Sequence, residues 1–411
     1  HLLDAGCGEG IYDRVAIYKN KKESEPLYVI HKGEMKREII DEAIKNDKRY
    51  ICNRNMKLLR LAEDGSTMKM WVSAAMDTTL DAVWHPKELF KTITENIGYP
   101  TPTTMNGLQD PELIQDVMLA NWYTSADWQA ASLNYLIENE GVEVIFSHFH
   151  AIDLQSHMIV RYLSDKGENK LPPEDFQKFM EDIYIQADYY VGKFIHLLDE
   201  GWTVLIVSDH GLMTVLEDEP PLIGDAYGVN IRVMQELGLT TLKVNENGNE
   251  LKEIDWSKTT AVAQRGNHIY INLKGRDEHG IVDLADKYEL ERKIIDDLYS
   301  YRWNGKRIIA LAVRAKEAAH FGLNGYNCGD IIYFNEEGFN RIHGDSISTY
   351  QGYADTSVSP IFIAAGPNIK QNYVTDRVIR EVDVAPTVAV LGGVRMPAQC
   401  EGAPVYQILE K

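Results

Sequence analysis

The sequence predicts an α/β fold built around a mostly parallel sheet, and three stretches carry this prediction. Residues 203–207 and 142–147 are short apolar runs rich in β-branched residues, the pattern of strands that are buried on both faces. A long helical pattern over residues 172–200 joins the two runs. Strands joined through a helix form a right-handed crossover, so we expect their carboxyl ends to be neighbours. Ligands bind at that edge of an open α/β sheet.

Other periodic stretches predict the elements around this unit. Residues 33–48 show the spacing of an exposed amphipathic helix, and residues 87–97 and 126–138 predict two further helices. Residues 69–74 predict a strand, whereas the Pro- and Thr-rich residues 99–107 predict a loop.

The pattern changes between residues 213 and 325, where short strands, a hairpin signal and an acidic loop replace the alternation of buried strands and helices. Buried-strand patterns resume at residues 330–334 and 359–367. We therefore expect one α/β core made of residues 1–212 and 326–411, with residues 213–325 inserted as a smaller α+β lobe that helps to select the substrate.

Composition limits the classes of partner. The chain has 411 residues, of which 44% are hydrophobic and 25% charged, as in ordinary globular proteins. Its formal net charge of -20 argues against a nucleic-acid polymer, because such binding depends on clustered Lys and Arg. A small anionic substrate is still compatible with the negative net charge, because bound divalent metal ions can make the electrostatic field in their site positive.

Cysteine usage and hydropathy predict a cytoplasmic protein without a membrane partner. The four cysteines, Cys7, Cys52, Cys328 and Cys400, lack the close spacing of zinc ligands, so we expect free thiols in a reducing compartment. No apolar run approaches the roughly 18 residues that a membrane span needs. The chain opens with His1, without an initiator Met or a leader, so we expect that further sequence precedes it. Nothing in the sequence indicates the oligomeric state.

The first ten residues look like the glycine-rich first motif of class I methyltransferases that use S-adenosylmethionine, with Asp4 followed by glycines at alternate positions. Such glycines let the backbone approach a nucleotide cofactor ahead of a helix, and Glu34 stands where a ribose-binding acid can fall. Residues 19–26, however, form a charged segment that ends in Pro26. A plain glycine-rich turn is therefore the favoured interpretation, and the methyltransferase is a remote alternative.

The strand predicted at residues 203–207 runs into Ser-Asp-His-Gly, which places Asp209 and His210 side by side where the strand ends. A carboxylate oxygen and an imidazole nitrogen are natural zinc ligands, and Gly211 lets the backbone turn freely. For this motif alone, an ordinary polar turn is the favoured interpretation.

A second acid–histidine pair follows the strand predicted at residues 142–147. If a helix begins near Asp153, then Asp153 and His157 lie one turn apart on the same face and can converge on one ion. For His148 and His150 we expect the role of satisfied polar side chains or of partners to the ligands. Because the crossover makes the two strand ends neighbours, the second pair strengthens the first.

His343 is a further candidate ligand. It lies in a Gly- and Ser-rich loop between two predicted strands, and loops of this kind carry function more often than packing. His268, His279 and His320 have no ligand-type residue near them in the sequence, so we interpret each as structural or exposed.

In this order the motifs resemble the alkaline phosphatase superfamily, and within it the type I phosphodiesterase and nucleotide pyrophosphatase branch that includes phosphonoacetate hydrolase-like members. The similarity extends over residues 130–411 and rests on the D-x3-H pair, SDHG, NHIYINLKGRDEHGIV, His343-Gly344, PIFIAAGPNIK and VDVAPTVAVLGG. It implies a three-layer α/β/α sandwich around the mostly parallel sheet and a metal-dependent hydrolase of phosphate esters.

The resemblance also implies two divalent metal ions, usually zinc, with Mn2+ as an alternative. Asp153, His157 and His343 would hold one ion, and Asp209 and His210 would help to hold the other. The sequence around His343 departs from the HGY-type loop of nucleotide pyrophosphatases.

The hydroxyl nucleophile has no counterpart in this chain. Relatives complete the second ion with an Asp at the end of the first strand and a Thr or Ser shortly after it, and we expect both to lie upstream of His1. Residues 71–77, followed by Thr101, Thr103 and Thr104, imitate that pair. They occupy a part of the chain that follows the nucleophile in relatives, so we interpret them as a chance likeness.

The predicted function is therefore a two-metal phosphodiesterase or nucleotide pyrophosphatase that acts on a small anionic substrate containing phosphate or phosphonate. A phosphonate, phosphomonoester or sulfate ester hydrolase of the same superfamily stays open, because each would use the same metal site. A chain that binds metal without catalysis is a further alternative, because no nucleophile is identified.

Overall fold

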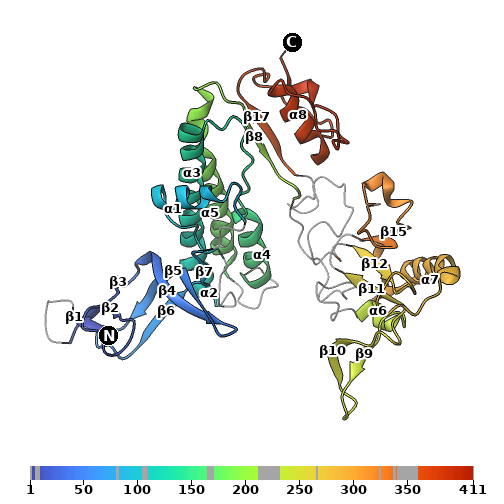
Figure 1. Ribbon diagram of the computed structural model, residues 1–411, viewed down its shortest axis with the longest axis horizontal. Helices are drawn as coiled ribbons and strands as arrows, with labels where there is room; N and C mark the ends of the chain where they lie inside the picture. The colour runs from blue at the N-terminus through green and yellow to red at the C-terminus, as the bar shows by residue number, and fades with distance from the viewer. Residues whose placement is uncertain are drawn as a thin grey trace. The chain divides into compact units, whose positions relative to one another are not determined.

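The computed structural model describes residues 2–4, 10–79, 83–103, 110–163, 171–211, 232–264, 267–323, 325–336, 339 and 360–410. The chain divides into two compact units, His1–Val204 and Leu205–Lys411. Each unit combines helices and strands, which agrees with the predicted α/β class at this coarse level (Figure 1).

The first unit begins with two antiparallel sheets. One contains β1 (Leu2–Asp4), β2 (Tyr12–Ile17) and β3 (Tyr28–His31), and the other contains β4 (Met35–Lys45), β5 (Lys48–Leu61), β6 (Met68–Val72) and β7 (Met76–Asp77). Buried side chains from both sheets, among them Ile30, Ile39 and Leu58, form one core.

The β4–β5 hairpin stands where the sequence pattern predicted a helix over residues 33–48. Asn46 and Asp47 form its turn with φ angles of 51° and 60°, left-handed values that Asn and Asp tolerate and that match the twist of a hairpin. Ile40 and Ile44 are exposed, so the apolar spacing marks no buried helical face. The helix prediction was wrong because it ignored the turn signal of the Asn-Asp pair.

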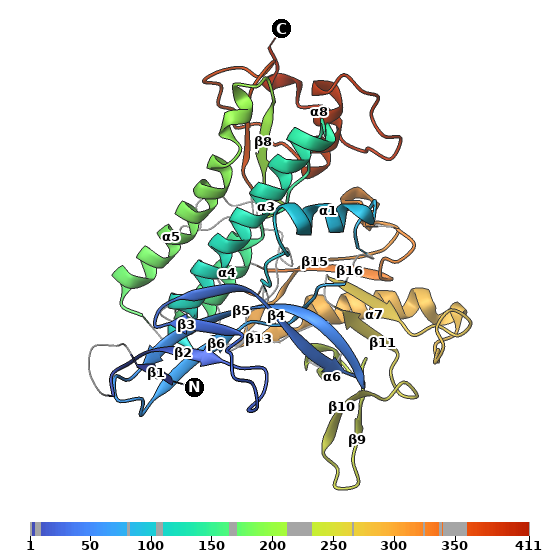
Figure 2. The same ribbon diagram turned by 60° about the vertical axis from the view of Figure 1, so that its left-hand side comes forward.

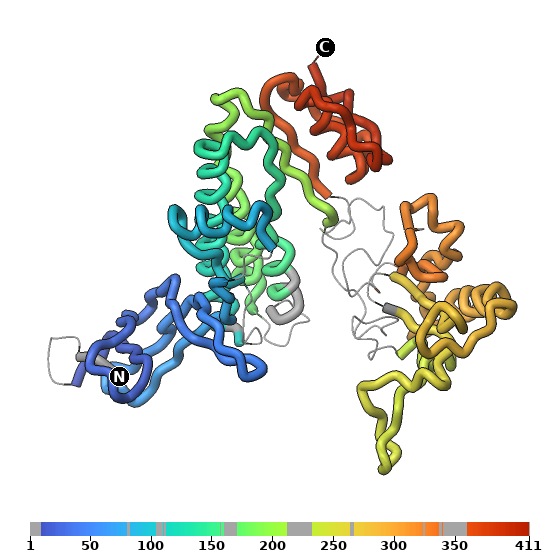
Figure 3. Tube along the Cα trace, viewed as in Figure 1, coloured from blue at the N-terminus to red at the C-terminus, as the bar shows by residue number. Residues whose placement is uncertain are grey.

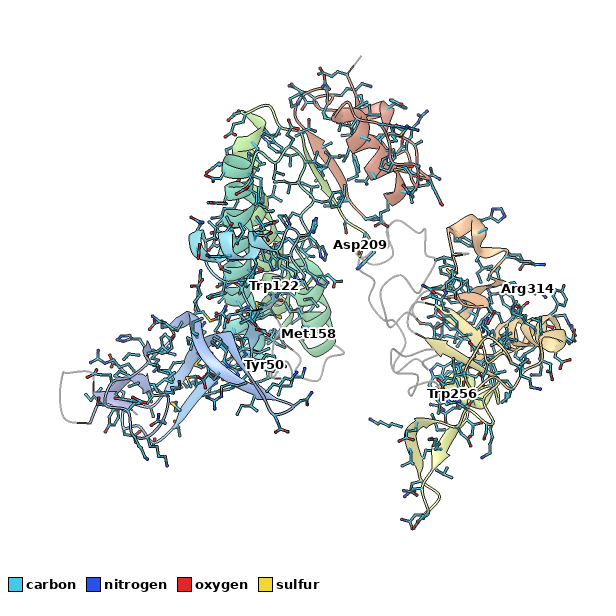
Figure 4. All side chains as sticks on the ribbon, in the orientation of Figure 1. Tyr50, Trp122, Met158, Asp209, Trp256 and Arg314 are labelled. Atoms are coloured by element: carbon cyan, nitrogen blue, oxygen red, sulfur yellow. The ribbon has the colours of Figure 1, made fainter. Side chains whose placement is uncertain are left out.

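Helices make up the rest of the first unit. They are α1 (Glu88–Asn96), α2 (Pro111–Leu113), α3 (Leu119–Glu140), α4 (Ala151–Leu163) and α5 (Pro173–Gly192), with a π-helical turn at Ile114–Met118 and a 3-10 turn at Ile195–Leu198. Helices α3, α4 and α5 lie side by side (Figure 2). They share a core that includes Trp122, which is labelled in Figure 4, together with Ile159 and Ile183. The helices predicted near residues 87–97 and 126–138 are confirmed.

Helix α5 shows why this part of the chain is helical. Pro173 occupies the start of the helix, where an N–H has no helical partner, and Glu174 and Asp175 follow in the first turn, where carboxylates interact favourably with the helix dipole. Ile183 and Tyr190 lie on the predicted apolar stripe and are buried. The helix predicted over residues 172–200 is therefore confirmed as far as Gly192.

Residues 142–147, by contrast, belong to no strand in the part of the chain that the structure describes. Val144 and Phe146 expose 61% and 77% of their surface. A strand needs a neighbour for its backbone hydrogen bonds, and these residues pair with no described strand. The prediction of a buried strand from the apolar run was wrong for this reason.

The second unit contains a four-stranded antiparallel sheet. Its order is β11 (Ala261–Gln264), β12 (His268–Ile271), β16 (Ile331–Asn335) and β15 (Ile309–Arg314). Helices α6 (Arg232–Glu236) and α7 (Lys287–Ser300) contribute to its core. Two shorter sheets pair β9 (Leu242–Val244) with β10 (Glu250–Ile254) and β13 (Arg302–Trp303) with β14 (Lys306–Arg307), and 3-10 turns lie at Leu284–Asp286 and Ala318–Phe321.

Strand β16 is the strand predicted at residues 330–334, but its partners differ from those expected. It pairs antiparallel with β12 and β15, Ile331 standing opposite Ile269 and Arg314. The mostly parallel sheet is not confirmed, since every strand pair whose register is known within the described residues is antiparallel. The boundaries predicted for the inserted lobe at residues 213 and 325 stay a prediction.

Strand β8 (Val204–Val207) pairs with β17 (Phe362–Ala365). The chain then continues through a 3-10 turn at Glu381–Asp383, helix α8 (Val384–Leu391) and a last 3-10 turn at Tyr406–Ile408, in the red segment of Figure 3. Phe362 packs against the buried residues Ile369, Val405 and Ile408. This small core joins β17, and through it β8, to the C-terminal segment.

None of the helices within the described residues combines the length and the apolar character needed to cross a membrane.

A buried carboxylate joins α7 to the four-stranded sheet. Asp330 is 6% exposed and accepts hydrogen bonds from the Arg276 guanidinium at 2.8 and 2.9 Å and from the Ile271 amide at 2.8 Å. Lys287 Nζ lies 3.1 Å from the same carboxylate. Burial acts to raise the pKa of Asp330, but the hydrogen bonds outweigh burial and hold this pKa below its usual value.

We predict that Asp330→Asn lowers the free energy of unfolding by about 3–5 kcal/mol, because Arg276 and Lys287 lose the charge that compensates them. The lowered folded pKa means that the Asp330 carboxylate stabilises the fold above its unfolded pKa of about 3.9. This stabilisation is lost as the pH falls through the folded pKa. Urea unfolding at a series of pH values measures both effects.

The matched control is Asp283→Asn, which removes an exposed carboxylate lying 2.7 Å from Lys274 Nζ. An exposed ion pair of this kind contributes about 0–1 kcal/mol. Equal destabilisation by the two substitutions would contradict the role given to Asp330.

Candidate functional site

Helix α4 provides the helical start that the Asp153/His157 spacing requires. It begins at Ala151, just before Asp153. Ala151 and Ile159 are buried in the core shared with α3 and α5, so the apolar side of the helix faces its neighbours. Asp153 therefore sits in the first turn of a well-packed helix, where a carboxylate is stabilised by the helix dipole.

Asp153 contacts the imidazole of His150, the residue directly before α4. His150 Nε2 lies 2.7 Å from Asp153 Oδ2. The Asp153 side chain is 18% exposed and that of His150 is 44% exposed. The ring of His148 lies close to that of His150, with the two ring centroids 4.9 Å apart. At the start of the helix, the Asp153 carboxylate thus contacts one imidazole, and that imidazole lies against a second one.

His157 lies one turn further along α4 than Asp153, and a spacing of four residues puts both on the same side of the helix. The side chain of His157 and the whole of His343 lie outside the described residues. Their roles as ligands stay predictions.

A buried amide pair holds α4 against the neighbouring helices. Gln155 and Gln186 are 1% and 0% exposed. Gln155 Nε2 donates to Gln186 Oε1 at 2.7 Å, and Gln186 Nε2 donates to the Leu119 carbonyl at 2.7 Å. Sequence reasoning missed this link. The signal was Gln186 itself, which falls between Ile183 and Tyr190 on an apolar stripe, where a polar side chain must find a hydrogen-bond partner.

Asp209 and His210 follow β8 directly, as predicted, and Asp209 lies at the end of that strand (Figure 4). The Ser208 amide donates to the Ile361 carbonyl at 3.3 Å, so the pairing of β8 with the β17 segment extends to the start of the turn. Ser208 Oγ donates to the His210 carbonyl at 2.6 Å, and the His210 amide donates to Asp209 Oδ1 at 3.1 Å. These bonds give the turn a defined shape.

The hydrogen bond of the His210 ring indicates which ring nitrogen carries a hydrogen. Its Nδ1 lies 2.6 Å from the Gly211 carbonyl. Because a carbonyl oxygen only accepts, Nδ1 carries the hydrogen, and in the neutral ring the lone pair is on Nε2. Nε2 lies 3.8 Å from Asp209 Oδ2, so an imidazole nitrogen and a carboxylate oxygen stand next to each other.

The donor chemistry of these residues fits zinc, which takes imidazole nitrogen and carboxylate oxygen. Asp153 belongs to the first unit, whereas Asp209 and His210 belong to the second. Within the described residues, no three or more His, Cys, Asp or Glu side chains gather into a group that could hold a metal ion. The sharing of ligands between two ions therefore stays a prediction.

Residues 71–77 and 101–104 imitate in sequence the metal-binding Asp and the nucleophilic Thr of relatives. In the structure, Asp77 and Thr101 make ordinary hydrogen bonds. Asp77 Oδ1 accepts the amide and the hydroxyl of Thr79 at 2.8 and 2.7 Å. Thr101 is 8% exposed, and its hydroxyl lies 3.5 Å from the Thr124 carbonyl. Thr104 lies outside the described residues. Asp77 is therefore used in local hydrogen bonds with Thr79, and the Thr101 hydroxyl in a hydrogen bond to α3.

The structure gives no support to the methyltransferase alternative. A cofactor motif of that kind needs a helix after its glycine turn, but the next described element is β2, which pairs antiparallel with β1. Glu34, the proposed ribose-binding acid, accepts the His31 amide at 2.8 Å in a local turn.

A comparison with protein families matches residues 61–358 to the type I phosphodiesterase / nucleotide pyrophosphatase family, over more than half of the chain. The matched range contains all five candidate ligands, Asp153, His157, Asp209, His210 and His343. It begins before the resemblance described above, which starts at residue 130, and it ends before PIFIAAGPNIK and VDVAPTVAVLGG. No curated protein and no solved structure matches the chain.

We predict that Gln155→Leu and Gln186→Leu each lower the free energy of unfolding by about 1–3 kcal/mol, because each leaves a buried amide without its partner. The double substitution is expected to cost less than the sum of the two, since it removes both amides together. Chemical denaturation of the wild type, the single variants and the double variant gives this coupling energy.

Gln177→Leu serves as the control, because Gln177 is exposed on α5 and bonds only to Glu181 Oε1, at 2.8 Å, among the contacts described. It should change stability by less than about 0.5 kcal/mol. Strictly additive losses for Gln155 and Gln186 would show that the amide pair does not couple the helices.

Proposed function

Since the chain belongs to the type I phosphodiesterase / nucleotide pyrophosphatase family, we propose that it hydrolyses phosphodiesters with the help of two divalent metal ions. Family membership confirms the resemblance found from the motifs and supports the coarser assignment, a phosphoester hydrolase. The phosphodiester specificity and the use of two ions are the proposal.

The observation that carries this proposal is the position of the two acid–histidine pairs. Asp153 and His157 lie at the start of α4, and Asp209 and His210 directly follow β8. Donors placed at the ends of regular elements have well-defined backbone positions, which a metal site requires. Two pairs on different elements supply two sets of donors, the number that two ions need.

Asp153, His157 and His343 would hold one ion, and Asp209 and His210 would help to hold the other, with zinc favoured by the donors and Mn2+ as an alternative. When bound, such ions stabilise the charge that develops at phosphorus and lower the pKa of the attacking hydroxyl. No residue of this chain is proposed as that hydroxyl nucleophile.

The chain's own residues would prepare the donors for this chemistry. The hydrogen bond from His210 Nδ1 to the Gly211 carbonyl keeps the lone pair on Nε2. The Asp209 side chain is 68% exposed, so a substrate in solution can reach it.

The proposed substrate is a small anion with a phosphodiester or pyrophosphate bond. The formal charge of -20 disfavours a nucleic-acid polymer, and the metal ions would supply the positive charge that attracts a small anion. Phosphonates, phosphomonoesters and sulfate esters are alternatives within the same superfamily. Residues 213–325 would select among them.

The finer features of the fold and the location form part of the same proposal. The three-layer α/β/α sandwich, with its core in residues 1–212 and 326–411, is what the family resemblance implies. A cytoplasmic location is supported by Cys52, Cys328 and Cys400, which are free thiols in the structure.

We predict that the protein hydrolyses a p-nitrophenyl phosphodiester faster than the corresponding phosphomonoester in the presence of Zn2+ or Mn2+, and that chelation abolishes the activity. Asp209→Asn should reduce the rate by more than about 100-fold, because loss of an outer-shell partner alone costs about 10–100-fold. Initial rates with each metal measure this effect. Asp188→Asn, which removes an exposed carboxylate of α5, is the control and should retain the wild-type rate.

Hydrolysis that survives Asp209→Asn would overturn the two-metal proposal. A second candidate function, metal binding without catalysis, follows from the lack of an assigned nucleophile. It predicts zinc binding in calorimetry that Asp209→Asn weakens, with no hydrolysis of either substrate.

A further inference from the structure

The hydrogen bond between His150 and Asp153 has a defined donor and a defined acceptor. His150 Nε2 lies 2.7 Å from Asp153 Oδ2, the length of a strong hydrogen bond between an N–H and a carboxylate. An ionised carboxylate only accepts hydrogen bonds, so Nε2 must carry the hydrogen and donate it. The imidazole is therefore the donor, and the carboxylate of the candidate ligand is the acceptor.

The assignment of donor and acceptor decides whether His150 is itself a metal ligand or a hydrogen-bond partner of the candidate ligand Asp153. A nitrogen that carries a hydrogen has no lone pair for a metal ion, so Nε2 cannot bind an ion while it donates to Asp153. The other ring nitrogen, Nδ1, points away from the side of the ring that meets the carboxylate. An ion held by Asp153 therefore binds the carboxylate, and the His150 imidazole stays the hydrogen-bond partner of that carboxylate.

The backbone and a neighbouring ring both hold His150 in place. Its carbonyl accepts the Leu154 amide at 3.2 Å, the first hydrogen bond of α4. Its ring lies at 35° to the ring of His148, with the centroids 4.9 Å apart. Asp153 lies only three residues further along the chain, in the first turn of α4, and this short spacing keeps the two side chains close together.

We propose that His150 is a positioning residue for Asp153, whose hydrogen bond fixes the direction in which the carboxylate meets the metal ion. The proposal rests on the proposed two-metal function, and it adds a residue to the site that is not one of the five candidate ligands. Outer-shell partners of this kind typically contribute about 10–100-fold to metal affinity.

The test is a zinc titration by calorimetry of the full chain, with His150→Ala, His150→Gln and Asp153→Asn. We expect His150→Ala to weaken zinc binding at one site by about 10–100-fold. His150→Gln keeps an N–H that can donate to the carboxylate, so it should recover most of this loss. His196→Ala, which removes an exposed histidine of the 3-10 turn at Ile195–Leu198, is the control and should leave the affinity unchanged.

The absorption spectrum of bound Co2+ separates positioning from ligation. If His150 only positions Asp153, saturated His150→Ala keeps the wild-type Co2+ spectrum, because the set of ligands is the same. A changed spectrum would show that His150 is itself a ligand, and it would overturn the positioning role. Without metal, the His150→Ala and His150→Gln variants should keep the wild-type melting temperature, since the His150 side chain is 44% exposed.

Two different failures can be told apart. Unchanged zinc affinity in Asp153→Asn would overturn the metal assignment on which the proposed function depends. Loss of zinc binding in Asp153→Asn, together with wild-type affinity in His150→Ala, would overturn the positioning role alone.

Discussion

Helix α4 is held by a polar interaction that is buried inside an apolar core. The amides of Gln155 and Gln186 bond to each other and then to the Leu119 carbonyl, so α4, α5 and α3 are joined in one chain of hydrogen bonds. Buried amides tolerate few other arrangements, because any rearrangement leaves a polar group unpaired. These hydrogen bonds fix the position of α4, and they thereby fix the start of the helix, where His150 and Asp153 lie.

Much of the helical structure could be predicted from the sequence, because a helix satisfies its backbone within its own segment. Helices α1, α3 and α5 therefore follow from local apolar spacing and from first-turn residues such as Pro173. Strands depend on partners elsewhere in the chain. For this reason residues 142–147 were misassigned, and β16 was recognised as a strand while its pairing with β12 and β15 was not foreseen.

In the candidate site, too, features that depend on neighbouring residues in the chain could be predicted, and features that depend on the fold could not. The sequence located Asp209 and His210 after a strand and Asp153 at the start of a helix, since these depend on neighbours in the chain. The order of the motifs led to the family that the comparison matched. The position of Gln186 on an apolar stripe signals a buried polar contact, but its partners Gln155 and Leu119 could not be predicted, because only the fold brings them close.

The short separation between His150 and Asp153 has a consequence for the order in which the site forms. Closing so short a loop costs little chain entropy, and the contact can form as soon as the first turn of α4 does. The Asp209–His210 turn instead depends on β8 meeting β17, which lies beyond the four-stranded sheet in sequence. Contacts between distant segments form slowly in folding. The position of the Asp153 carboxylate is therefore encoded locally, whereas the Asp209–His210 turn takes its position only when long-range pairing is complete.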